Sequence, residues 1–480
     1  MNNLYKNSIL YVAANLAVKA TSFLMVPIYS YLVSPYEYGQ VFIATSFISF
    51  MSLFVTCSLH GAINRFFWEC NDVISVKKMY STISYMVAIA AVTMIMIMEI
   101  FSREISDFIN LPIIYLRIAI ISSVFSCFYT VVTALLYVKR EAKKISLISI
   151  VVGFCQILIQ IGMVLSMDNK AMAMILSQLI CSIFVFIIYL IYSRPYLIPI
   201  FDTQRAWIYL KYSVNQVPSD VSVWLLQFSD RMMINKMKGS SMAGIYGMGQ
   251  NLGSIPKFFF YSINKAYVPF VFECYKGIEK GENHKMQELK RHTTLIFAIV
   301  TVMCTTIIIF SNNVVALLNE RYSRATLVML VMLFAMMIDC YRTIFMNPLT
   351  YNVKYIKVCS FIWILSAVIN IFLNYYLIPI YAVNGACFVM IFSYTLTFFM
   401  IVCFAKKAFW VDYDVSAMGK VFAVSVAASS IMLLGTSWIM FPVKLLLSLL
   451  YIYSLTLILK IKAKDLLSKF YVSLNNKLHK

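Results

Sequence analysis

Charged residues are scarce in this sequence. Only 12% of its 480 residues are Asp, Glu, Lys or Arg, whereas 61% are hydrophobic. Soluble globular proteins carry about 25% charged residues, so this composition excludes an ordinary soluble domain. Apolar runs of roughly 20 residues recur along the chain, and each is long enough to cross a bilayer as a helix. The sequence therefore predicts an all-α polytopic membrane protein.

Motifs for metal sites and disulfides are also missing. The 11 cysteines stand singly without a CxxC pair, and the 4 histidines are far apart in the sequence. Isolated cysteines in apolar runs behave as small buried residues, and a zinc site needs clustered ligands. We therefore expect no disulfide framework, no metal site and no cofactor.

Fourteen apolar segments are candidates for transmembrane helices. They are continuously apolar, whereas the strands of a membrane barrel alternate, so we expect helices. The first segment is too long, and too polar on one side, for a cleavable signal peptide. The expected spans are 8–33, 41–60, 80–100, 114–138, 145–166, 171–193, 212–236, 243–268, 293–312, 325–349, 358–380, 384–404, 418–439 and 443–462.

The spans suggest two lobes of six helices followed by two further helices. The expected lobes are residues 1–200 and 201–405, and residues 406–480 would hold the last two helices and a basic tail. Because six is even, the second lobe would repeat the first in the same orientation, as in parallel-repeat transporters. The pairs Tyr38-Gly39 and Tyr246-Gly247, which follow spans one and seven, give weak support to such a repeat.

Acidic residues are half as frequent as basic ones, which gives a formal net charge of +20. When the loops are assigned alternately to two sides, most Lys and Arg fall on the side of the amino terminus. The positive-inside rule then places both termini in the cytoplasm. The largest clusters are 139–144, the expected loop 273–292 and the tail 460–480. We interpret them as topology signals that contact anionic lipid, not as a nucleic-acid site.

Polar residues recur on one face of the first span, where Asn15 and Lys19 align and Lys19 lies near the bilayer centre. Residues about 3.6 apart share a helix face, and a polar stripe on a spanning helix faces away from lipid. Two interpretations of Lys19 stay open. It lines a water-filled lumen, or it pairs with a buried carboxylate or extends to the interface.

The eighth span has the clearest polar face. Gln250, Lys257 and Asn264 belong to a series spaced three or four residues apart, with Lys265 beside it. Such spacing places the whole series on one side of a helix. One face of this span is therefore predicted to avoid lipid.

The seventh span contains charges inside a segment long enough to cross the membrane. Pro218 could begin its regular helix, which would place Asp220 in a first turn that favours a carboxylate. Asp230 and Arg231 would lie toward the external interface. Eleven residues are nearly three helical turns, so Asp220 and Arg231 could also face one cavity. Helix capping with an interfacial pair is the alternative.

The tenth span carries Asp339 and Arg342, which are spaced to pair on one helix face. This spacing favours a structural pair over a ligand-binding one. A coupling role remains the alternative.

Three stretches resemble a known family. They are "VPIYSYLVSPYEYGQVFIATSF" at 26–47, "DRMMINKMKGSSMAGIYGMGQNLGSIP" at 230–256 and "LNYYLIPIYAVNGACFVMIFSY" at 373–394. In order and position they resemble segments of the polysaccharide transporter branch of the multidrug/oligosaccharidyl-lipid/polysaccharide (MOP) flippase superfamily, and within it the O-antigen flippases. Many members have twelve helices, so the last two spans depart from the family pattern.

The resemblance implies a fold, a substrate and a location. The fold would have two six-helix lobes around a central cavity lined chiefly by helices one, two, seven and eight. The substrate would be an undecaprenyl-pyrophosphate-linked oligosaccharide, moved from the cytoplasmic to the periplasmic leaflet of the bacterial inner membrane. Implied partners are this lipid-linked substrate, membrane lipids and, as candidates, the O-antigen polymerase and chain-length regulator.

Sugars and a pyrophosphate cross hydrocarbon only at high cost, so such a protein needs a wet, cationic path. Its candidate residues are Asn15, Lys19, Asp220, Arg231, Gln250, Lys257, Asn264 and Lys265. The lysines and Arg231 would supply positive charge, and the amides would bind sugar hydroxyls. Asp220 is a candidate for coupling to a proton or cation gradient, and nothing in the sequence identifies the ion.

Other functions stay open. A lipid II or multidrug transporter of the same superfamily is the nearest alternative, and fourteen spans favour the first of these. A membrane-embedded polymerase, ligase or glycosyltransferase is less well supported, because such enzymes would be expected to carry a large periplasmic loop or an acidic motif near an interface. The expected external loops here are short and contain few carboxylates.

Overall fold

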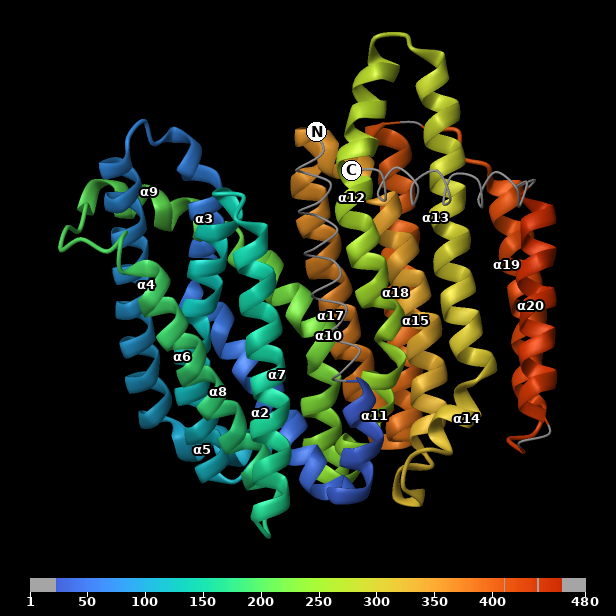
Figure 1. Cartoon of the computed structure of the whole chain (residues 1–480), viewed down its shortest axis with the longest axis horizontal. Coiled ribbons are helices and arrows are strands. Elements are labelled where there is room, and N and C mark those ends of the chain that lie inside the picture. Colours follow the sequence, from blue (N-terminus) through green and yellow to red (C-terminus); the bar gives the residue numbers. More distant parts are fainter. Residues whose placement is uncertain (1–22, 410, 438–439, 460–480) are drawn as a thin grey trace, which may run out of the picture. The chain divides into compact units, whose positions relative to one another are not determined.

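The described part of this computed structural model comprises residues 23–409, 411–437 and 440–459 (Figure 1). These residues form helices and no strand, which confirms the predicted all-α membrane fold. Eleven helices of the described chain are long and apolar enough to cross a membrane, and a shorter apolar helix covers Phe23–Leu32. This is a multi-pass membrane protein.

The helices follow the predicted spans closely. The α-helices are α2 Pro35–Thr56, α3 Leu59–Phe66, α4 Val73–Ile100, α5 Ser102–Ile109, α6 Ile113–Val138, α7 Ala142–Ser166, α8 Lys170–Ser193, α9 Thr203–Val214, α10 Val217–Lys238, α11 Ser240–Gly253, α12 Ile255–Glu279, α13 Asn283–Ile309, α14 Ser311–Val315, α15 Ala325–Phe345, α16 Asn347–Tyr351, α17 Ile356–Tyr381, α18 Val383–Ala408, α19 Val415–Ser429 and α20 Met440–Ile458. Short 3₁₀ turns cover Phe67–Glu69, Glu320–Tyr322, Val353–Tyr355 and Ser430–Leu433. The total of fourteen spans stays a prediction, because the described residues of the first span form only a short helix and polar residues interrupt the seventh and eighth.

Two predicted details of the chain are wrong. The second span was expected to be continuous, but α2 ends before Cys57 and Ser58, which have φ values of 41° and 55°, and α3 follows. Such left-handed conformations are strained for residues other than glycine. The stretch 273–292 was expected to be a loop, but α12 and α13 continue through it and form a hairpin that extends beyond the neighbouring helices (Figure 1).

Charge pairing explains the helical hairpin. Lys285 Nζ lies 3.2 Å from Glu273 on the opposite helix and 3.3 Å from Glu288 on its own helix. Lys and Glu are also good helix formers, so a polar stretch rich in both can continue a helix outside the membrane.

The helices group into two compact units. Unit 1 comprises Met1–Leu252, Leu318–Val328 and Ser360–Ser393, and unit 2 comprises Gly253–Leu317, Met329–Cys359 and Tyr394–Lys480. The helices α15, α17 and α18 contribute residues to both, as does α11, whose last residue Gly253 belongs to unit 2. The partition into two six-helix lobes and a final helix pair stays a prediction.

In unit 1, α6 packs against α8 and α2, and α10 packs against α2. The start of α11 crosses the start of α2 at very close range. A Cβ atom on Gly39 would overlap the Ser240 carbonyl, and a Cβ atom on Gly244 would overlap the Pro35 carbonyl. Small residues at such a crossing let two membrane helices approach backbone to backbone. This contact holds α11 beside α2.

In unit 2, α13 packs against α12, α19 and α20 around a core that includes Tyr275 and Cys304. Gly253 lies against α15, where an added Cβ would be 2.5 Å from Met332 Cβ and 2.9 Å from the Met329 carbonyl oxygen. This close approach holds the start of α12 next to α15. It therefore positions the charged residues described next.

Candidate functional site

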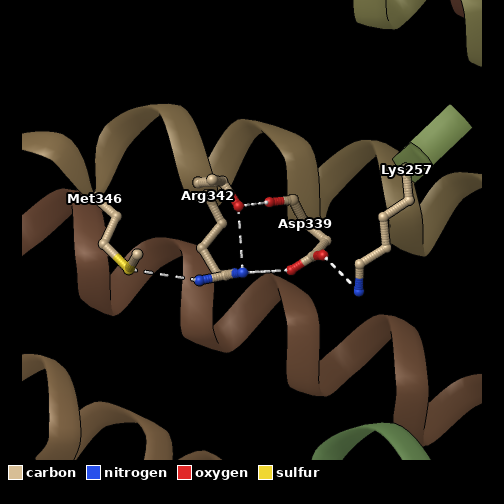
Figure 2. A network of polar contacts seen from close by, with 5 residues as sticks. Lys257, Asp339, Arg342 and Met346 are labelled. Atoms are coloured by element: carbon tan, nitrogen blue, oxygen red, sulfur yellow. Dashed lines mark hydrogen bonds and ion pairs between the residues drawn. The ribbon is translucent and has the colours of Figure 1, made fainter. Parts of the chain in front are cut away.

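Three charged side chains of unit 2 form one cluster, which we call the charge triad: Lys257, Asp339 and Arg342. Figure 2 shows Lys257 and Arg342 approaching the Asp339 carboxylate from opposite sides. Arg342 donates from Nε and Nη2 to Asp339 Oδ1, at 2.9 Å and 2.6 Å. Lys257 Nζ lies 3.3 Å from the other oxygen, Oδ2. The ion pair predicted from the spacing of Asp339 and Arg342 is confirmed, and Lys257 joins it from α12.

Further contacts, on α15 and just after its end, hold the arginine in place. Arg342 Nη2 donates to Thr343 Oγ1 at 3.3 Å, and Nη1 lies 3.8 Å from Met346 Sδ (Figure 2). The Thr343 hydroxyl donates to the backbone carbonyl of Asp339 at 2.9 Å. The guanidinium is thus fixed by Asp339 and Thr343 of its own helix and by Met346 just beyond the end of that helix.

The charge triad contains two cations and one carboxylate. The side chains of Asp339 and Arg342 are only 3% and 4% exposed, whereas that of Lys257 is 13% exposed. The three side chains together carry a formal charge of +1, which favours an anion at the accessible edge of the cluster. That edge is the lysine.

A second cluster lies in unit 1 around Asp230, whose carboxylate is buried and accepts three hydrogen bonds. The donors are the backbone N–H of Arg231 at 2.8 Å, the Gln250 amide at 3.2 Å and the Tyr246 hydroxyl. Asp230 is only 5% exposed, so protein surrounds its carboxylate, and its place toward the external interface stays a prediction. Hydrogen bonds replace its hydration in the interior.

The Arg231 side chain is held by aromatic and polar groups of unit 1. Its Cζ lies 4.0 Å from the ring centre of Phe42 and 4.4 Å from that of Phe228. Nε donates to Gln250 Oε1 at 2.8 Å, and Nη1 donates to Ser46 Oγ at 3.4 Å. Cation–π contacts of this kind are stronger in a desolvated site than on an open surface. The guanidinium is therefore a preorganised cation.

Asp220 and Arg231 have different partners in the structure. Pro218 and Asp220 occupy the first turn of α10, as predicted, and Asp220 Oδ2 accepts a hydrogen bond of 2.6 Å from Ser58 Oγ. Ser58 is one of the two strained residues between α2 and α3. Asp220 therefore stabilises the break in the second span.

The remaining predicted residues are placed less fully. Asn15 and Lys19 lie outside the described residues. Asn264 is half-buried on α12, and its Oδ1 accepts no hydrogen bond from the described part of the chain. Lys265 is exposed on the same helix. In the described ranges no group of three or more His, Cys, Asp or Glu residues could hold a metal ion.

Sequence reasoning missed Asp230 and Tyr246 as members of a polar cluster, and Phe42 and Phe228 as platforms for Arg231. An acidic residue inside a largely apolar helix was a signal for Asp230. Phe228 lies three residues before Arg231 on the same helix, a spacing that indicates a contact. No comparable signal existed for Phe42, which belongs to another helix and is one of 36 phenylalanines in the sequence.

The sequence of this chain is similar to a known protein family and to two bacterial proteins. Residues 28–322, more than half of the chain, match the family model described as polysaccharide biosynthesis protein. A protein of the Haemophilus influenzae Lsg locus is 24% identical over 57% of this chain and 67% of its own length. An uncharacterized membrane protein of Haemophilus influenzae is 24% identical over 82% of this chain and 97% of its own length.

Solved structures share the fold at low identity. The lipid II flippase MurJ, in an inward closed conformation, has a TM-score of 0.76 with 13% identity, over 93% of this chain and 99% of that chain. A multidrug resistance MATE family transporter of the MOP superfamily, in an outward-facing conformation, has a TM-score of 0.52 with 13% identity, over 86% of this chain and 95% of that chain.

Proposed function

Because this chain belongs to the polysaccharide biosynthesis protein family and shares the fold of a flippase, we propose that it is a polysaccharide flippase of the MOP superfamily, and that it moves undecaprenyl-pyrophosphate-linked O-antigen or other surface-polysaccharide repeat units across the bacterial inner membrane. Movement would run from the cytoplasmic to the periplasmic leaflet, with both chain termini in the cytoplasm. Coupling to a proton or cation gradient would drive it.

The observation that carries the proposal is the charge triad. A carboxylate with two cations lies within helices α12 and α15, and its surplus charge is positive. A diphosphate headgroup needs a cation when it leaves water, whereas its polyprenyl chain can stay in lipid. Arg231, held by Phe42 and Phe228, is a second preorganised cation in unit 1. These groups bind and release an anion without making or breaking a covalent bond, which is transport and not catalysis.

Lipid II is the second candidate substrate. The structure of the lipid II flippase MurJ matches nearly the whole of this chain in fold. Lipid-linked sugars of either kind present the same diphosphate to a cationic path. The two candidates therefore differ in the sugars, and the experiment must identify which lipid-linked intermediate accumulates.

Deletion of the gene, followed by analysis of lipid-linked intermediates in each leaflet, tests the proposal. We expect surface-polysaccharide repeat units to accumulate on the cytoplasmic side and the polymer to disappear. Accumulation of lipid II instead would establish the second candidate. Normal polymer and normal lipid intermediates, in a strain without a redundant flippase, would refute both. Crosslinking to the O-antigen polymerase and chain-length regulator would test these proteins as partners.

A further inference from the structure

We infer that Lys257 is an exchangeable cation. Its ammonium separates from Asp339 and binds the diphosphate of the lipid-linked substrate, while Arg342 keeps Asp339 in place. This inference rests on the proposed function and assigns separate tasks to the three residues. Lys257 would contact the substrate. Asp339 would compete with the diphosphate for Lys257, and Arg342 would be a positioning residue.

The first argument is the difference between the two contacts of the carboxylate. Arg342 makes two short hydrogen bonds to Asp339 Oδ1 and is held by Thr343 and Met346 as well. Lys257 makes one longer contact, of 3.3 Å, to Oδ2. Two short charge-assisted bonds are stronger than one long contact, so Lys257 is the partner that separates more easily.

The second argument is access. The Lys257 side chain is about three times as exposed as that of Arg342, at 13% against 4%. Its Nζ also lies 5.5 Å from the ring centre of Tyr261, an exposed residue of α12. An ammonium on a flexible four-carbon stem can turn from one anion to another, whereas the arginine fork is fixed by its geometry. An arriving anion therefore meets the lysine first.

The third argument is charge balance. When Lys257 turns away, Asp339 and Arg342 remain as a neutral pair, so the departure leaves no unpaired buried carboxylate. The ammonium exchanges a carboxylate oxygen for a phosphate oxygen. Because Asp339 competes for the same ammonium, the diphosphate is bound less tightly than by a free lysine. A transporter must bind its substrate firmly enough to admit it and weakly enough to release it, and this competition meets both needs.

The test measures binding of farnesyl diphosphate, a short polyprenyl diphosphate, to purified protein in lipid nanodiscs at fixed ionic strength. Inorganic pyrophosphate is the second probe, and it separates the contribution of the headgroup from that of the chain. We expect Lys257→Ala to weaken binding of both probes by roughly 10- to 100-fold, the range for loss of one charged hydrogen bond. Lys276→Ala is the matched control, because it removes one positive charge from an exposed position on the same helix.

Asp339→Asn distinguishes competition from simple positioning. If Asp339 competes for Lys257, this variant binds diphosphate more tightly than the wild type, and adding Lys257→Ala abolishes the gain. Asp339→Asn also leaves two buried cations without a carboxylate, which endangers folding. The double variant Asp339→Asn/Arg342→Gln removes both charges of the fixed pair, and we expect it to bind at least as tightly as the wild type.

Two results would overturn the inference. One is unchanged diphosphate binding in Lys257→Ala. The other is weaker binding in folded Asp339→Asn and in folded Asp339→Asn/Arg342→Gln, because Asp339 would then help the diphosphate to bind. Failure of the proposed function appears separately, as normal polymer and lipid intermediates after gene deletion, and it would leave the measured binding differences standing.

Discussion

Gly253→Ala should destabilise the protein by forcing the end of α11, and with it the start of α12, away from α15. The added Cβ would lie 2.5 Å from Met332 Cβ and 2.9 Å from the Met329 carbonyl oxygen. Carbon atoms in ordinary contact are about 3.5 Å or more apart, so the two segments must separate by roughly 1 Å. Neither atom can rotate away, because one is a Cβ and the other belongs to the backbone. Overpacking of this kind costs about 1–3 kcal/mol.

The same shift should weaken the charge triad. Lys257 follows Gly253 by about one helical turn, and Asp339 follows Met332 by about two turns. If the helices separate by roughly 1 Å at these residues too, the distance from Lys257 Nζ to Asp339 Oδ2 increases from 3.3 Å to beyond the 4 Å limit of an ion pair. Gly253→Ala should therefore also change diphosphate binding.

Gly162→Ala is the matched control. Gly162 lies inside α7, and among the described residues no atom would lie within 4 Å of its added Cβ. Alanine is favoured over glycine inside a helix by about 0.5–1 kcal/mol, so this variant should be as stable as the wild type or more so. Apparent unfolding midpoints of the purified proteins, read as loss of the monodisperse peak after heating, compare the two. An equal or higher midpoint for Gly253→Ala than for Gly162→Ala would refute the reasoning.

Three further predictions concern other parts of the chain. Asp220→Ala should lower the unfolding midpoint, because the buried Ser58 hydroxyl loses its acceptor at a cost of about 1–3 kcal/mol. Asp220→Asn keeps an acceptor oxygen, so equal midpoints for the two variants would contradict this prediction. In a cysteine-free background, an impermeant maleimide on intact cells should label cysteine substituted for exposed Ser323 but not for exposed His284; the reverse pattern would refute the proposed orientation. Lys19→Ala should reduce polymer export at a normal level of membrane-inserted protein, with Lys19→Arg retaining more activity; full export by Lys19→Ala would exclude it from the substrate path.

Much of the fold could be predicted because its signal is local. A run of apolar residues long enough for the bilayer indicates a spanning helix without any knowledge of its neighbours. Each expected span from the second to the fourteenth overlaps a helix of the structure. The spacing of Asp339 and Arg342 also predicted their pairing, because neighbours three residues apart on a helix meet whatever surrounds them.

The expected internal repeat shows the limit of a local sequence pattern, and it stays a prediction. The sequence paired Tyr38-Gly39 with Tyr246-Gly247, whereas the closest contact joins Pro35 and Gly39 to Ser240 and Gly244. The contact is reciprocal. Gly39 lies against the carbonyl of Ser240, four residues before Gly244, and Gly244 lies against the carbonyl of Pro35, four residues before Gly39. Both glycines were visible in the sequence, but a glycine shows which helix it faces only after the helices have packed.

Local patterns in the chain were enough to indicate the membrane class, the helical segments and the family of this protein. The packing of the helices was needed to show that Lys257 lies beside Asp339, that Phe42 contacts Arg231, and that Asp220 stabilises the break at Ser58. Apolar length and helical spacing depend on residues close together in the chain. Ion pairs and cation–π contacts between helices depend on which faces meet, and the packing of small residues at the helix crossings sets that choice.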